Sequence, residues 1–196
     1  AGGGDNARHE VDAARVEAHG LLTQAGLAQV FGPELSPLVR GQAPWQARLL
    51  PQRDGSGLFF EADLRDLELR LPAPLAKAQG EPLLLQVRTS AAGNDSQVLE
   101  LQMQERVTGK LAFQRATSGW TLTHGRIGIG EKVTQLPSQS GLQLGARLPA
   151  LNADDWWPLL RQNLSDSGDS GWLDTVSRVN AEVESLEAFG RGFGRL

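Results

Sequence analysis

The sequence predicts a mainly-β protein, built on one long, bent antiparallel sheet with two short helices. Three observations support this fold class. Apolar and polar residues alternate in segment after segment, which is the period-2 pattern of strands with one buried face. Glycine-containing turn signals separate many of these segments. Helical spacing is confined to two short stretches, so helices are expected to form a small part of the chain.

The longest strand pattern is GLFFEADLRDLELRLPAPLAK, which begins at Gly57. Its apolar residues first fall on even positions, over Leu58–Leu64, and then on odd positions, over Leu67–Leu71. Because side chains alternate between the faces of a strand, this slip requires one extra residue, and we predict a β-bulge near Arg65-Asp66. The Pro-Ala-Pro sequence that follows ends the pairing, since proline lacks the N–H that a ladder needs.

The other elements follow from the same signals in chain order. A strand over Ala13–Gly20 ends at its glycine, and an amphipathic helix over Thr23–Phe31 ends at Gly32-Pro33. Further strands are predicted at Trp45–Leu50, Pro82–Thr89, Gln97–Gln104, Lys110–Arg115, Trp120–Ile129, Gly141–Leu148 and Val176–Leu186.

The second helix is predicted to begin after Asn152, because asparagine caps helices by accepting a hydrogen bond from a free backbone N–H. Asp154 and Asp155 lie in its first turn, where the helix dipole favours negative charge. Residues 165–171 are expected to form a polar loop or linker, and residues 1–12 a flexible tract. The whole chain, 1–196, is interpreted as one β-rich segment.

Composition excludes several classes of function. The net charge is −4 and the arginines are scattered, which argues against nucleic-acid binding. The chain has no cysteine, and its three histidines lack the spacing of a metal site. Two carboxylate pairs occur, Asp154-Asp155 and Asp63 with Asp66; the first is explained by a helix start, and Asp63 by the solvent face of a strand. No G-x-S-x-G motif occurs. We therefore expect no enzyme activity, no cofactor and no metal.

Two neighbouring tryptophans, Trp156 and Trp157, lie on the second predicted helix. Such a pair serves as a membrane-interface anchor, as a lid over a ligand, or as packing at the end of a sheet. Packing is the interpretation that we favour, and the other two stay open.

The run that begins at Gly57 resembles the strand and LP-x-PL-x-K motif of the bacterial YhdP family of large AsmA-like envelope proteins. Three other segments resemble that family in the same order along the chain. They are the G-x-x-x-W strand opening at Gly41–Trp45, the short helix at Asn152–Leu160, and the strand at Val176–Leu186. The resemblance covers the chain from about Val16 to its end.

This resemblance implies a long, curved, groove- or taco-like sheet whose apolar inner face holds lipid acyl chains. It also implies an internal periplasmic segment of an inner-membrane-anchored protein that moves phospholipid between the inner and outer membranes. The partners would be phospholipid acyl chains and the remaining segments of the same long chain. Open sheet edges would also allow the segment to self-associate.

Under this hypothesis the apolar positions of the strands contact lipid. The predicted lipid-contacting residues are Leu58, Phe60, Leu64, Leu83, Leu85, Leu99, Leu101, Met103, Leu111, Phe113, Leu122, Ile127, Leu142, Leu144 and Trp156. An ordinary closed core would produce the same alternation, so a structural or protein-interaction β-domain of the envelope is the alternative. A carbohydrate-binding or glycosidase-like β-domain is a third hypothesis, with Trp45 and Trp120 as its candidate residues.

Overall fold

The computed structural model describes residues 16–26, 37–52, 55–117, 119–165 and 176–193. The predicted flexible tract at 1–12 lies outside these residues, as do most of the Thr23–Phe31 helix and nearly all of the 165–171 loop. Residues 23–26 of that helix are described: Thr23 still belongs to the preceding strand, contrary to the prediction, and residues 24–26 are helical.

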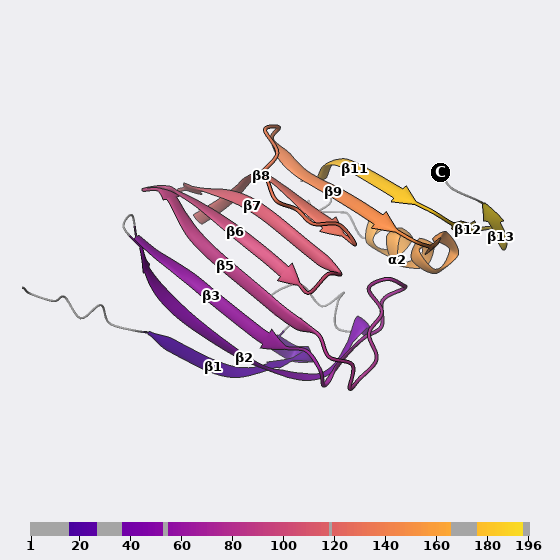
Figure 1. Ribbon diagram of the computed structural model, residues 1–196, viewed down its shortest axis with the longest axis horizontal. Coiled ribbons are helices and arrows are strands. Elements are labelled where there is room, and N and C mark those ends of the chain that lie inside the picture. Colours follow the sequence, from indigo (N-terminus) through magenta and orange to yellow (C-terminus); the bar gives the residue numbers. More distant parts are fainter. Residues whose placement is uncertain (1–15, 27–36, 53–54, 118, 166–175, 194–196) are drawn as a thin grey trace, which may run out of the picture.

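One large sheet dominates the structure (Figure 1). Its strands are β1 (Glu17–Thr23), β2 (Val39–Gln52), β3 (Gly55–Asp63), β4 (Leu67–Leu69), β5 (Leu84–Gly93), β6 (Ser96–Met103), β7 (Val107–Ala116), β8 (Gly119–Ile129), β9 (Gly141–Leu148) and β11 (Val176–Val183). Their spatial order is β1-β2-β3-β5-β6-β7-β8-β9-β11, and β4 pairs with β2. A small second sheet holds β10 (Leu151–Asn152), β12 (Leu186–Ala188) and β13 (Arg191–Phe193).

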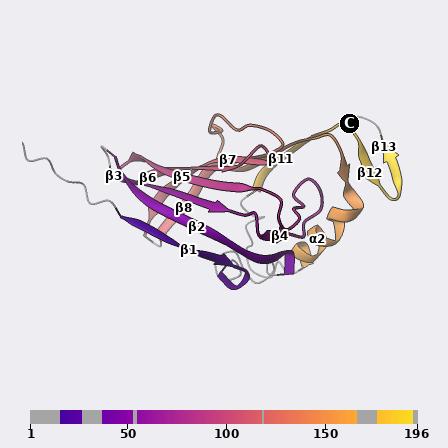
Figure 2. The same cartoon turned by 60° about the horizontal axis from the view of Figure 1, so that its bottom comes forward.

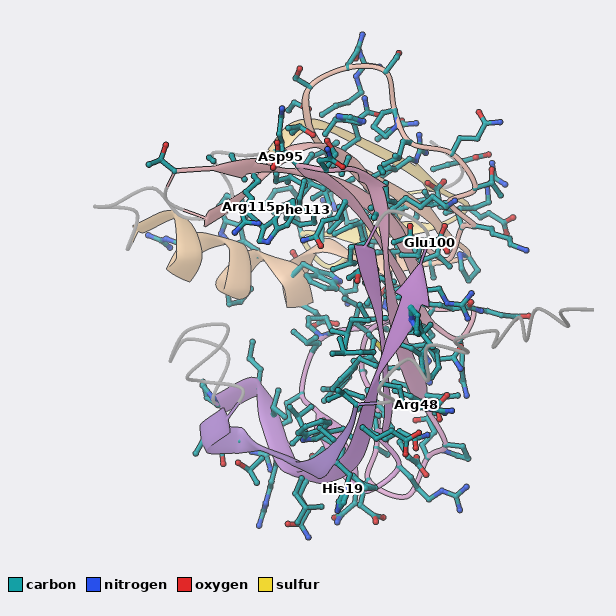
Figure 3. All side chains as sticks on the ribbon, turned by 90° about the vertical axis from the view of Figure 1, so that its left-hand side faces the viewer. His19, Arg48, Asp95, Glu100, Phe113 and Arg115 are labelled. Carbon is teal, nitrogen blue, oxygen red and sulfur yellow. The ribbon has the colours of Figure 1, made fainter. Side chains whose placement is uncertain are left out.

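The large sheet is strongly curved (Figures 1 and 2). Seen from its end in Figure 3, it forms an open C, with β1 and β2 along the lower arm and the later strands along the upper arm. The first and last strands of the order, β1 and β11, do not pair with each other, so the sheet does not close on itself. The mainly-β, curved fold predicted from the sequence is confirmed.

The prediction of an antiparallel sheet is correct from β1 to β8 and wrong beyond β8. There β8 pairs with β9, and β9 with β11, in parallel. A parallel pair needs a crossover connection instead of a hairpin turn. The chain between Ile129 and Gly141 supplies one, and the segment between β9 and β11, which includes α2 (Ala153–Ser165), supplies the other.

The connection after β8 packs on the polar face of the sheet. Thr108 fixes it, because its hydroxyl donates to the carbonyl of Glu131 at 2.8 Å and accepts from the amide of Val133 at 2.8 Å. The Glu131 carboxylate also pairs with Arg126 at 2.6 Å. Gly128 provides the necessary space, since a Cβ there would come within 2.6 Å of the Glu131 side chain.

The predicted bulge near Arg65-Asp66 is confirmed by the pairing register. Trp45 pairs with Ala62 and Gly41 pairs with Leu67, so four steps along β2 match five along the β3–β4 segment. Gly41 has a φ of +102°, and a Cβ added to it would collide with the carbonyl oxygen of Asp66. The extra residue therefore fits because the opposite strand has a glycine there.

A buried apolar core lies beside this bulge. It contains Val39, Ala43, Ala62, Leu64, Leu67 and Leu83. Trp45, Phe60, Leu85 and Met103 pack against it from the neighbouring strands. This cluster lies near β4, and further buried apolar side chains, among them Val107, Leu142 and Val183, lie on β7, β9 and β11.

Asn152 caps α2 as predicted. Its side-chain oxygen accepts hydrogen bonds from the amides of Asp154 at 2.9 Å and Asp155 at 3.3 Å. In turn, the Asp154 carboxylate accepts from the amides of Phe189 and Gly190, which lie between β12 and β13. The helix start and the β12–β13 hairpin are therefore held together.

Candidate functional site

The pairing registers assign the strand residues to two faces. Residues directly opposite each other in a ladder share a face. The row through Trp45 contains Gly20, Trp45, Ala62, Leu85, Met103, Val107, Ile129, Ala146 and Ala181. The next row contains Ala18, Ala47, Phe60, Val87, Leu101, Gly109, Ile127, Leu144 and Val179.

The rows continue on the same face toward the other ends of the strands. A third row contains Leu49, Leu58, Thr89, Leu99, Leu111, Gly125, Leu142 and Val176. Shorter rows follow with Ala91, Gln97, Phe113 and Leu122, and finally Arg115 and Trp120. We call the residues of these five rows the inner face, because Figure 3 places Phe113 on the concave side of the sheet.

The inner face is apolar over nearly its whole area, yet it is incompletely covered. Leu99, Leu101 and Leu111 are only partly buried, and Val179 is 69% exposed. Trp45 and Phe60 stack with their ring centroids 5.7 Å apart. Among the described elements, α2 packs mainly on β12 and not on the sheet. The inner face is therefore an extensive apolar surface that the described part of the chain leaves largely open.

All the residues predicted to contact lipid lie on the inner face except Leu64, Leu83 and Trp156. Leu64 is 5% exposed and Leu83 is 1% exposed, and both belong to the buried core beside the bulge. They lie outside β3 and β5, where strand alternation no longer assigns a face.

Trp156 lies on α2 and not on a strand. Its indole N–H donates to the carbonyl of Ala73 at 2.9 Å, and Ala73 belongs to the Pro-Ala-Pro segment after β4. This hydrogen bond joins the part of the chain that follows β9 to the part that follows β4, across one end of the concave side (Figure 2). The geometry of Trp156 therefore favours packing over a role as a membrane anchor or a lid. Its neighbour Trp157 is 60% exposed.

Several residues of the inner face were not among those predicted to contact lipid. Val87 and Ile129 continue the alternation of the predicted strands, so the same pattern predicts that they lie on this face. Trp45 and Leu49 were harder to assign, because small Ala43 and Ala47 interrupt the apolar pattern of β2. Val179 lies in a strand whose other inner-face members include an alanine, so its pattern is weak.

The opposite, outer face is polar. One of its rows contains Arg48, Phe59, Arg88, Glu100, Lys110, Arg126, Gln143 and Arg178. Figure 3 shows Arg48 and Glu100 on this convex side. The guanidinium groups of Arg48 and Arg88 lie 5.5 Å and 5.7 Å from the centre of the Phe59 ring.

A depression lies on this outer face, between the sheet and the connection after β8. Its lining includes Arg88, Glu100, Lys110, Glu131 and Lys132. Opposite charges pair inside it, since the Lys110 ammonium lies 2.7 Å from the Glu100 carboxylate. This charged surface offers no continuous apolar contact for a hydrocarbon, so the inner face is the better candidate for an apolar ligand.

The described residues contain no group of three or more His, Cys, Asp or Glu side chains that could hold a metal ion. No helix within the described ranges is long and apolar enough to cross a membrane.

Comparison with known proteins now identifies the family. The family model of the YhdP protein matches residues 4–196. The chain belongs to the YhdP family. It is 28% identical, over 199 aligned residues, to the Escherichia coli (strain K12) protein named intermembrane phospholipid transporter YhdP. That alignment covers 83% of this chain and 15% of the relative, so the chain spans only a small part of the relative's length. No solved structure was found to match the chain.

Proposed function

We propose that this chain forms one stretch of a hydrophobic groove that shelters phospholipid acyl chains as they pass between the inner and outer membranes. The inner face would line the groove, and the polar outer face would contact water in the periplasm. The observation that carries the proposal is the open apolar inner face, which crosses the sheet from β1 to β11. The name of the E. coli relative supports phospholipid as the cargo.

The physical basis is the cost of exposing hydrocarbon to water. Each CH₂ group removed from water contributes about 0.8 kcal/mol, so a continuous apolar surface greatly lowers the barrier for a lipid that crosses an aqueous space. Rows of leucine, phenylalanine and valine side chains provide such a surface, and no charged side chain lies in the central rows of the inner face. The role needs no catalysis, so the proposal is a non-enzymatic one.

The free edges of the sheet fit a segment of a longer groove. Strands β1 and β11 are the first and last in the spatial order, so each has one edge that no other described strand pairs with. Such edges pair readily with another strand. In the longer, inner-membrane-anchored protein, neighbouring segments would pair with them and continue the inner face on both sides.

The alternative is a scaffold domain with a closed core. It requires another layer of protein over the inner face, whereas the buried core cluster lies beside β4 and only separate inner-face residues elsewhere, such as Val107 and Leu142, are buried. The partial exposure of Leu99, Leu101 and Leu111 therefore favours the groove.

The test is site-specific photo-crosslinking in cells that express the longer protein. A photoreactive amino acid replaces Leu101 on the inner face, or Gln102, its neighbour on the outer face. The proposal expects phospholipid adducts at position 101 and a background signal at position 102. Equal adduct yields at the two positions, or none at either, would contradict it.

A further inference from the structure

The inner face carries one charged residue at one end. Among the described residues that form its rows, Arg115 alone is charged. It pairs with Trp120 across β7 and β8, in the last row of the face. Phe113 lies two residues before it on the same strand and faces the same way. A positively charged side chain therefore lies at the edge of the apolar surface.

The Arg115 side chain has no ionic partner in the described part of the chain. No carboxylate there lies within ion-pairing distance of its guanidinium, and the residue is exposed. Several outer-face cations differ in this respect, since Lys110 and Arg126 each pair with a glutamate. The guanidinium of Arg115 is thus available to an external anion.

The backbone holds Arg115 in place. Its amide donates to the carbonyl of Asp95 at 2.8 Å, which ties the end of β7 to the turn between β5 and β6. Figure 3 shows Arg115 and Phe113 close together at the inner side of the upper arm. The position of the cation relative to the apolar rows is therefore set by the sheet itself.

The neighbours of Arg115 change in polarity along the strands. Trp120, opposite it, is 46% exposed and combines an apolar ring with one N–H donor. The next row contains Gln97 beside Phe113 and Leu122, and the row after that contains Leu99 and Leu111. A phospholipid has the same order of groups, which is an anionic phosphate, polar glycerol esters and then hydrocarbon.

We infer that Arg115 binds the phosphate of a phospholipid whose acyl chains lie along the inner face, with Trp120 beside the glycerol esters. The arginine fork donates two parallel hydrogen bonds to phosphate oxygens, a geometry that a single lysine ammonium does not reproduce. This inference rests on the proposed function, and it adds the orientation in which the lipid enters this segment. It also predicts that the segment discriminates phospholipids from lipids without phosphate.

The experiment compares two lipids with identical acyl chains, dioctanoyl-phosphatidylglycerol and dioctanoylglycerol. Binding of each to the chain is measured by native mass spectrometry, and circular dichroism confirms the fold of every variant. The wild-type chain is expected to bind the phospholipid about tenfold more tightly, which corresponds to about 1.4 kcal/mol. Arg115→Gln should remove most of this preference and leave dioctanoylglycerol binding unchanged. Arg115→Lys should retain part of it.

The matched control is Arg178→Gln, which removes the same charge from an exposed arginine on the outer face. It should leave the preference intact. An unchanged preference in Arg115→Gln would overturn the inference while leaving the groove in place. Failure of the wild-type chain to bind either lipid would overturn the proposed function, and the inference with it.

Discussion

The ammonium of Lys77 lies 2.7 Å from the carbonyl oxygen of Leu67, inside the bulge that bends the β3–β4 segment. It also donates to the carbonyls of Arg65 and Ala78, each at 2.9 Å. The side chain is 2% exposed, so these three carbonyls are satisfied by one buried cation. The lysine of the LP-x-PL-x-K motif therefore stabilises the bulge.

Replacement of this lysine should destabilise the fold. Lys77→Met keeps the length of the side chain but removes the donor to the buried carbonyl of Leu67, while the carbonyl of Arg65 keeps only its bond from the amide of Gly80. The expected loss is about 2–3 kcal/mol in the free energy of unfolding, measured by urea denaturation. Lys132→Met, at an exposed lysine, is the control and should change stability little. Equal stability of the two variants would contradict the role of Lys77.

The same lysine predicts a dependence on alkaline pH. Burial lowers the pKa of Lys77 from its ordinary value of 10.5, although Glu81 acts to raise it. Between the lowered pKa and 10.5 the unfolded chain binds more protons than the folded chain, so this residue adds stability as pH rises. The stability difference between the wild type and Lys77→Met should therefore be larger at pH 10 than at pH 7. A smaller difference at pH 10 would show that the pKa is not lowered.

The bulge is a feature of the fold that the sequence alone predicts, whereas the parallel strand pairing is not. The change of apolar parity between Leu64 and Leu67 is a local property of the sequence, and it predicted the extra residue correctly. The parallel pairing of β8 with β9 was not predictable in this way, because alternation assigns faces and not strand directions. The crossover that determines it depends on Thr108, whose hydrogen bonds with Glu131 and Val133 join residues distant in sequence.

The glycine opposite the bulge provides a second test. Gly41→Ala would force a side chain into a φ of +102° and into the carbonyl oxygen of Asp66. Gly80 also has a positive φ, of +87°, but a Cβ there would meet nothing within 4 Å. Gly80→Ala should thus cost about 1 kcal/mol from backbone strain alone, and Gly41→Ala clearly more. Thermal denaturation of both variants checks this order, and equal midpoints would refute the close approach.

The link between α2 and the β12–β13 hairpin should weaken in acid. Hydrogen bonds from the amides of Gly190 and Phe189 lower the pKa of Asp154 from its ordinary value of 3.8. The carboxylate therefore stabilises the link above pH 3.8, and the effect is lost as pH falls through the lowered pKa.

Asp154→Asn should weaken this link even at neutral pH, because an amide has one acceptor oxygen where the carboxylate has two. Faster hydrogen exchange at the amides of Phe189 and Gly190 is the expected result. Asp155→Asn is the matched control and should leave both amides protected. The same exchange rates in the two variants would argue against the link.

The candidate site was predictable to the extent that it follows alternation. Leu99, Leu101 and Met103 lie on one face because β6 is regular and its partners keep register. Arg115 follows the alternation of Leu111 and Phe113 on β7, but it was not assigned to the site because the sequence prediction selected only apolar residues. The openness of the inner face was also beyond the sequence, because a closed core and an open surface have the same pattern.

The most direct measurement of the central claim is native mass spectrometry, with lipid extraction, of the chain purified from a bacterial host without detergent. The account predicts co-purifying phospholipid in the wild type and in Gln102→Asp, whose new charge lies on the outer face. It predicts loss of that lipid in Leu101→Asp, with a β-type circular dichroism spectrum retained. A lipid-free wild-type chain, or unfolding of Leu101→Asp as expected for a charge in a closed core, would contradict the account.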